Sequence, residues 1–110
     1  MCVMDYRKIA KEFAEEVKNS LGDLVKDVIL FGSVARGGDY REESDIDVLI
    51  VVDADPWEIQ KKVSELVVMY LLEYGTYISV KVVSVEEFEF MKNINTAFYT
   101  NIRREGVSLG

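Results

Sequence analysis

Residues 31–52, FGSVARGGDYREESDIDVLIVV, decide how the rest of this chain is interpreted. The stretch opens where an apolar run ends at Phe31, continues through Gly32-Ser33, and leads through a charged loop to Asp45 and Asp47. Side chains two residues apart on a strand point to one face, so the two carboxylates are expected side by side, across a hairpin-like connection from the Gly-Ser turn. This arrangement suits a divalent cation that carries a phosphate.

The composition predicts an ordinary globular protein with one domain over residues 1–110. The chain is 49% hydrophobic and 30% charged, as is usual for such proteins. Cys2 is the only cysteine and histidine is absent, which excludes an internal disulfide, a cysteine zinc site and histidine acid–base chemistry. Neither a membrane-spanning run nor a signal-peptide pattern is found, so we expect a cytoplasmic protein without a membrane partner.

The charge balance disfavours nucleic acid as a direct partner. The net charge is −7, from 20 acidic and 13 basic residues, and the nearest thing to a basic patch is Arg103-Arg104. Nucleic-acid binding draws most of its affinity from contacts with phosphates. A template-directed polymerase is excluded further by length, since 110 residues leave no room for template-handling domains.

The pattern of apolar residues predicts a mixed α/β (α+β) fold, a small mixed sheet flanked by helices. Asp55 and Pro56 form a helix start, and Ser84 with Glu87 has capping-box spacing. The strand that follows Asp45 is apolar on both sides beyond its aspartates, as expected of a central strand. We expect helices over 5–21, 56–74, 85–92 and 97–105, and strands over 25–31, 45–52 and 76–83.

The helix over 56–74 is expected to bury one side against the sheet. Its apolar run 67–72 could instead expose a patch to a partner, although core is the simpler interpretation of most of that run. The side chains expected to face inward are Ile59, Val63, Leu66, Val67, Tyr70 and Leu71.

The Gly-Ser turn and the paired aspartates point to phosphate chemistry. A turn that enters a helix presents free backbone N–H groups to an anion, and Gly32 lets a phosphate approach closely. Asp45 and Asp47 repel each other unless a cation such as Mg²⁺ neutralises them, and a pair of metals would suit nucleotidyl transfer. The alternative is that Asp45 only caps the strand after the loop while Asp47 pairs with Arg36 or Arg41.

The segments FGSVARG and SDIDVLIVV resemble the nucleotidyltransferase signature of the DNA polymerase β superfamily. They are most similar to the minimal nucleotidyltransferases, short prokaryotic proteins common in archaea. The closing FYTNIRREGV resembles the tails of the same group, so the similarity covers most of the chain. It implies a polymerase β palm-like fold that binds a nucleoside triphosphate, usually ATP, with Mg²⁺.

The resemblance assigns roles to residues of the motif. Gly32-Ser33 would hold the β- and γ-phosphates, Asp45 and Asp47 would hold the metal and carry catalysis, and Arg36 would help bind the nucleotide. Lys81 is a further candidate for nucleotide binding, the alternative being an edge-strand lysine in solvent.

Active members of the superfamily usually carry a third carboxylate on the strand expected over 76–83. The matching positions here are Ser79 or Lys81, and neither provides it. Glu86 or Glu87 could substitute from the next helix, although both are better explained as capping residues.

The resemblance also implies a partner. Members of this group often pair with a helical HEPN-type protein as the antitoxin of a toxin–antitoxin system, and some transfer AMP to a tyrosine of that partner. We therefore expect an enzyme that moves AMP from ATP to a hydroxyl. The alternative is a catalytically incomplete module of the same fold that binds nucleotide or masks its partner. Homo-oligomerisation stays open.

Overall fold

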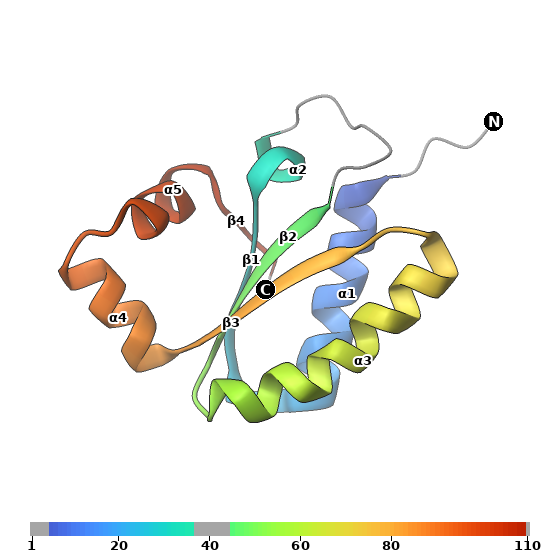
Figure 1. Cartoon of the computed structure of the whole chain (residues 1–110), viewed down its shortest axis with the longest axis horizontal. Helices are drawn as coiled ribbons and strands as arrows, with labels where there is room; N and C mark the ends of the chain where they lie inside the picture. The colour runs from blue at the N-terminus through green and yellow to red at the C-terminus, as the bar shows by residue number, and fades with distance from the viewer. Residues whose placement is uncertain (1–4, 37–44, 110) are drawn as a thin grey trace.

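The computed structural model describes residues 5–36 and 45–109, without the side chains of Ser33 and Arg36. The predicted loop of Gly37 to Ser44 lies outside the described residues. Helices and strands alternate along most of the chain (Figure 1). The elements are α1 (Tyr6–Leu21), a 3-10 turn (Gly22–Leu24), β1 (Val25–Phe31), α2 (Gly32–Arg36), β2 (Ile46–Val52), α3 (Pro56–Tyr74), β3 (Ile78–Ser84), α4 (Val85–Asn93), α5 (Ala97–Glu105) and β4 (Val107–Ser108).

The sheet is mixed, as predicted, with the strand order β3-β2-β1-β4. β2 pairs antiparallel with β1 and parallel with β3, so it lies between two strands, as its two-sided apolar pattern predicts. The predicted bounds of β1 are correct. β2 begins one residue later than predicted, at Ile46, and β3 covers Ile78–Ser84 instead of 76–83.

The sequence interpretation missed β4. This strand pairs Val107 with Leu30 and Ser108 with Ile29 of β1, and the next residue donates its backbone N–H to the Val28 carbonyl at 2.7 Å. Two residues are too short for an alternating pattern to be visible in a sequence. The pairing ties the end of α5 to the strand that leads into Gly32.

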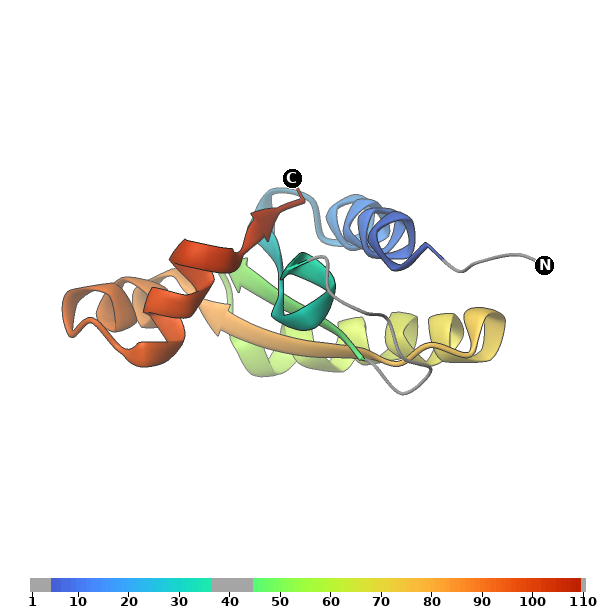
Figure 2. The same ribbon diagram turned by 90° about the horizontal axis from the view of Figure 1, so that it is seen from above.

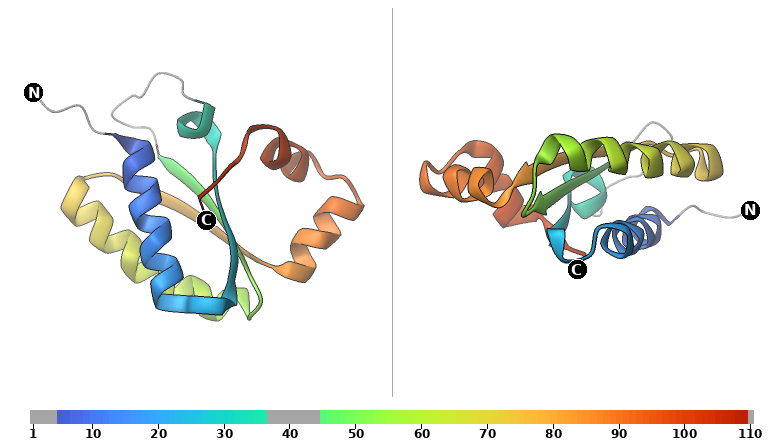
Figure 3. Two further views of the ribbon diagram at one scale, coloured as in Figure 1. Left: turned by 180° about the vertical axis from the view of Figure 1, so that it is seen from behind. Right: turned by 90° about the horizontal axis from the view of Figure 1, so that it is seen from below.

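One face of the sheet is covered by α1 and α3, which lie on the same side in two opposite views (Figures 1 and 3). The Phe13 ring of α1 meets the Tyr70 ring of α3 edge-on, with 5.4 Å between centroids. Alternate residues of β2 complete this core, namely Ile46, Val48, Ile50 and Val52. These four residues are two apart along the strand, so strand geometry places them on one face.

The other face carries a smaller core under α4 and α5. Leu49 and Val51 of β2 pack there with Ile29, Val83 and Ile102. Seen from above, α4 and α5 lie together at one end of the molecule, away from α1 and α3 (Figure 2). By strand parity this is also the face of Asp47.

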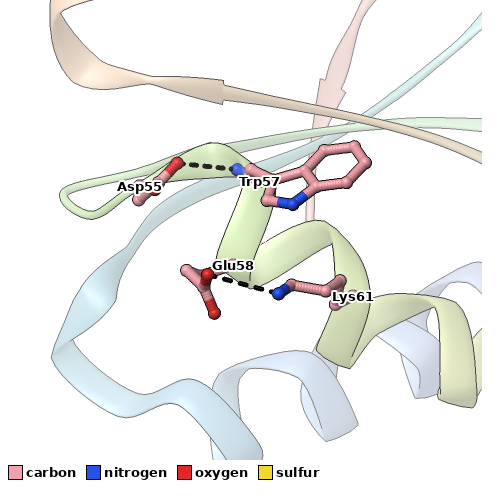
Figure 4. A network of polar contacts seen from close by, with 4 residues as sticks. All are labelled: Asp55, Trp57, Glu58 and Lys61. Atoms are coloured by element: carbon pink, nitrogen blue, oxygen red, sulfur yellow. Dashed lines mark hydrogen bonds and ion pairs between the residues drawn. The ribbon is translucent and has the colours of Figure 1, made fainter.

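The start of α3 is capped as predicted. The Asp55 carboxylate accepts a hydrogen bond from the Trp57 backbone N–H at 3.0 Å, and Pro56 takes the first helical position. Glu58 and Lys61 form an ion pair of 3.3 Å one turn later (Figure 4). In the part of the chain that is described, no helix has the length and apolar character needed to cross a membrane.

The outer side of α3 corrects two expectations. Leu71, expected inward, is 41% exposed, and Leu66 is only partly buried. Val68, Met69 and Leu72 of the apolar run are also exposed, Leu72 at 81%, so most of that run is surface and not core. The helix is apolar around most of its circumference over this turn, and only one side of it reaches the sheet.

Ser84→Ala is expected to lower the free energy of unfolding by about 1 kcal/mol, because Ser84 caps α4. Its hydroxyl accepts the Glu87 N–H at 3.0 Å, and the Glu87 carboxylate accepts the Ser84 N–H at 3.3 Å, which confirms the predicted capping box. Urea unfolding measures the loss. The control is Ser64→Ala, an exposed mid-helix serine; equal effects of the two changes would contradict the capping role.

Stability is expected to fall at high pH because of Tyr70. Burial, and then the hydrogen bond that its hydroxyl donates to Glu16 at 2.9 Å, raise the pKa of Tyr70 above its ordinary 10.0. The folded state thus favours the neutral phenol, so its contribution is intact below pH 10 and is lost as pH rises above that value. Urea unfolding between about pH 8 and 11 should show a smaller loss in Tyr70→Phe than in the wild type. Parallel losses would contradict the assignment.

Candidate active site

Gly32 is the point where the two ends of the motif meet. It leaves β1 and begins α2 with a φ of +76°, a backbone conformation that favours glycine. A Cβ at this position would overlap a carboxylate oxygen of Asp47 and would lie 3.1 Å from its Cγ. Glycine is therefore required here both by the backbone and by the close approach of Asp47.

β2 brings the aspartates to this turn. Asp47 pairs with Phe31, the residue before Gly32, in the antiparallel register of β1 and β2. Asp47 is half-buried and Asp45, just before the strand, is exposed. Between them Ile46 points into the opposite core and donates its N–H to the Tyr77 carbonyl at 3.1 Å. The expected meeting of the Gly32 turn with the Asp47 carboxylate is present.

β3 places Ser79 beside Asp47 in the parallel register, where the superfamily pattern leads one to expect a carboxylate. Lys81 follows on the same face of this edge strand and is exposed. Its Nζ lies 5.4 Å from the centre of the Phe98 ring, which in turn meets the Phe31 ring at 5.6 Å. Lys81 thus lies on the Asp47 face, and it is also the exposed edge-strand lysine of the alternative interpretation.

Glu86 and Glu87 lie at the other end of β3 from Ser79. Ser84 is five residues beyond Ser79, and a strand rises by about 3.3 Å per residue, so the capping box at Ser84 is roughly 16 Å from the Asp47 pairing. One oxygen of Glu87 accepts the Ser84 N–H. The structure therefore favours the capping role of Glu87 over a place beside Asp47.

The structure adds neighbours from α5 that the sequence did not single out. A cavity of about 130 Å³ adjoins Gly32. It is lined by Phe31, Gly32, Phe98, Asn101, Ile102 and Glu105. The sequence interpretation did not predict that α5 returns to the motif, because this contact depends on how α5 packs across β1.

The donor set suits Mg²⁺ together with a phosphate. Within residues 5–36 and 45–109, no cluster of three or more acidic, histidine or cysteine side chains is arranged to hold a metal by itself. Mg²⁺ commonly binds through one or two carboxylates plus phosphate oxygens, and Asp45 and Asp47 are two such carboxylates. Ser33 and Arg36 belong to α2, but their side chains are outside the described part of the structure.

Comparison with known proteins places this geometry in a family. The profile of the nucleotidyltransferase domain matches residues 7–104. This chain belongs to that family. A relative from Methanocaldococcus jannaschii, named as a candidate protein adenylyltransferase, is 45% identical over 103 residues, which are 94% of this chain and 96% of the relative. The expected minimal nucleotidyltransferase is thereby confirmed.

Solved structures share the nucleotidyltransferase fold. A candidate nucleotidyltransferase from Sulfolobus solfataricus matches with a TM-score of 0.56 and 25% identity, over 97% of this chain and 87% of that one. A chain from the complex of tri-AMPylated Shewanella oneidensis HEPN toxin with MNT antitoxin matches with a TM-score of 0.51 and 15% identity, over 97% of this chain and 72% of that chain. The second likeness speaks for the fold alone.

Proposed function

We propose that this minimal nucleotidyltransferase moves AMP from ATP, with Mg²⁺, to a hydroxyl on a partner protein. The observation that carries the proposal is the contact between Gly32 and Asp47 at the start of α2. It puts a carboxylate and a close-approach turn at one point, as a metal-bound phosphate requires. The name of the Methanocaldococcus jannaschii relative, a candidate protein adenylyltransferase, supports AMP and a protein acceptor.

Each residue of the motif has a task in this reaction. The N-terminal turn of α2, from Gly32-Ser33, faces the β- and γ-phosphates with backbone N–H groups, while Lys81 and Arg36 offset their charge. Asp45 and Asp47 would hold Mg²⁺, which when bound stabilises charge on the phosphates and the leaving group. The acceptor oxygen bonds to the α-phosphorus, the bond to the bridging oxygen breaks, pyrophosphate leaves, and the hydroxyl proton passes to water.

The proposed partner is a helical HEPN-type protein, with this chain as the antitoxin. The solved complex of an AMPylated HEPN toxin with an MNT antitoxin supports this choice, since the MNT fold is the one found here. A tyrosine hydroxyl of the partner is then the acceptor. The experiment mixes the purified chain, the HEPN-type partner and ATP labelled at the α-phosphate. Label that appears on the partner only in the presence of Mg²⁺ supports the proposal. If all of the partner were bound to this chain and still carried no label, the proposal would be overturned.

A second candidate is a module that masks its partner without chemistry. Ser79 favours it, because the position beside Asp47 holds a hydroxyl and not a third carboxylate. This candidate requires a partner complex that forms without ATP and survives Asp45→Asn. If the Asp45→Asn variant still bound the partner but no longer neutralised it, simple masking of the partner would be excluded.

A further inference from the structure

Apart from Lys81, the residues that line a groove between β3 and α4 are not used by the chemistry described above. It has a volume of about 550 Å³, within the range of sites that enclose small molecules. Its lining is Lys81, Val83, Glu86, Glu87, Phe90 and Met91. The walls are mostly apolar with a few charged groups at the rim, which is the usual chemistry of a ligand site.

The groove continues the face that carries Asp47. Ser79 pairs with Asp47, and Lys81 and Val83 follow on the same face at steps of about 6.6 Å. A nucleotide whose phosphates lie at Gly32 and Asp47 can therefore extend along β3. Lys81 would lie beside the phosphates, the ribose would follow along β3, and the base would reach the groove beside Val83.

The walls suit a flat aromatic ring. Val83 is 3% exposed and Met91 is partly buried, so both form a fixed apolar surface. Phe90 in contrast is 62% exposed, although it lines the groove. An exposed aromatic ring beside an apolar hollow is a stacking surface, and bases of any sequence stack on such rings.

The rim selects for a hydrogen-bond donor. Carboxylates only accept hydrogen bonds, and one oxygen of Glu87 is already used by the Ser84 N–H. Glu86, in the first turn of α4, lines the groove with Glu87. Their negative charge keeps phosphates out. A 6-amino group, as in adenine, can donate to Glu86, whereas the 6-oxo group of hypoxanthine cannot.

We propose that this groove binds the adenine of ATP, with Phe90 stacked on the base and Glu86 accepting a hydrogen bond from its 6-amino group. The inference rests on the proposed function, because it places the base of the same nucleotide whose phosphates occupy the Gly32–Asp47 site. It assigns base selection to β3 and α4, and it makes Glu86 the residue that discriminates ATP from ITP.

Calorimetric titration with Mg²⁺ and three ligands tests this assignment: ATP, ITP and inorganic tripolyphosphate. ATP should bind at least about tenfold tighter than tripolyphosphate, and Phe90→Ala should lose about that factor for ATP alone, from the cost of one stacked base. The wild type should prefer ATP to ITP by about tenfold, as for one hydrogen bond to a charged group, and Glu86→Ala should lose the preference. Ile94→Ala, an exposed apolar residue of the same region outside the groove lining, is the control and should bind like the wild type.

Three outcomes overturn the assignment. Equal affinity for ATP and tripolyphosphate would show that the base makes no contact. If Phe90→Ala bound ATP as tightly as the wild type but labelled the partner more slowly, the groove would bind the acceptor segment of the partner and not the adenine. If the wild type bound none of the three ligands, the proposed function itself would be overturned. If it bound ATP, ITP and tripolyphosphate equally well, only the assignment of the groove to the base would fail.

Discussion

Asp47→Asn is expected to lower the rate of AMP transfer to the partner by about a hundredfold or more, the usual cost of losing a group that stabilises transition-state charge. Asparagine keeps the size of the side chain and so its fit against Gly32. It removes the negative charge that a metal needs. The fold should therefore persist while the chemistry is lost, which is the signature of a group that acts at the reacting atoms. Transfer of α-labelled phosphate from ATP to the partner is the measurement.

The matched control is Asp53→Asn. Asp53 follows the other end of the same strand, β2, and is exposed, so the change removes one charge at a distance from Gly32. It should leave labelling within about twofold, as surface substitutions usually have small effects. If Asp47→Asn labelled the partner as fast as Asp53→Asn does, Asp47 would not be a catalytic residue.

Gly32→Ala is expected to destabilise the fold by about 3 kcal/mol, from a positive φ and a collision together. The φ of +76° strains any residue with a Cβ, and the new methyl group would overlap the Asp47 carboxylate. Either the Asp47 side chain must rotate away from the new methyl group or β1 and β2 must move apart, and both changes would separate the phosphate turn from the metal carboxylate. Urea unfolding gives the stability, and ATP affinity gives the effect on the site.

Gly75→Ala separates the two causes. Gly75 has a similar φ of +67°, but a Cβ there meets nothing within 4 Å. Gly75→Ala should lower the free energy of unfolding by only about 1 kcal/mol, because the positive φ is the only source of strain there. Combining Gly32→Ala with Asp47→Ala removes the colliding carboxylate, so part of the loss should be recovered in the double variant. Equal losses in Gly32→Ala and Gly75→Ala would contradict the close contact with Asp47.

Much of the fold could be predicted because local signals agreed with the global packing. Asp55 and Pro56 marked the start of α3, and Ser84 with Glu87 marked the start of α4, since caps are local interactions. The run Ile46–Val52 is apolar on both sides beyond Asp47, which indicated that β2 lies between two other strands. The outer side of α3 was predicted wrongly in part, since Leu71 and Leu72 are apolar yet no element covers them.

The site could be predicted only along the motif. The spacing of Gly32 and Asp47 around one hairpin-like connection was enough to expect their meeting. The register that puts Ser79 beside Asp47, the cavity beside Glu105 and the groove under Phe90 depend on how β3, α4 and α5 pack. Contacts between residues far apart in the sequence leave no periodic pattern, so these features needed the structure.

In the proposed reaction, Gly32, Asp45 and Asp47 form a metal-dependent nucleotide site. Titration of the purified chain with ATP in Mg²⁺, and again in EDTA, measures whether this site exists. We predict binding in Mg²⁺ that is lost in EDTA, is lost in Asp47→Asn, and is kept in Asp53→Asn. Absence of binding by the wild type in Mg²⁺, or equal binding by Asp47→Asn, would contradict the claim.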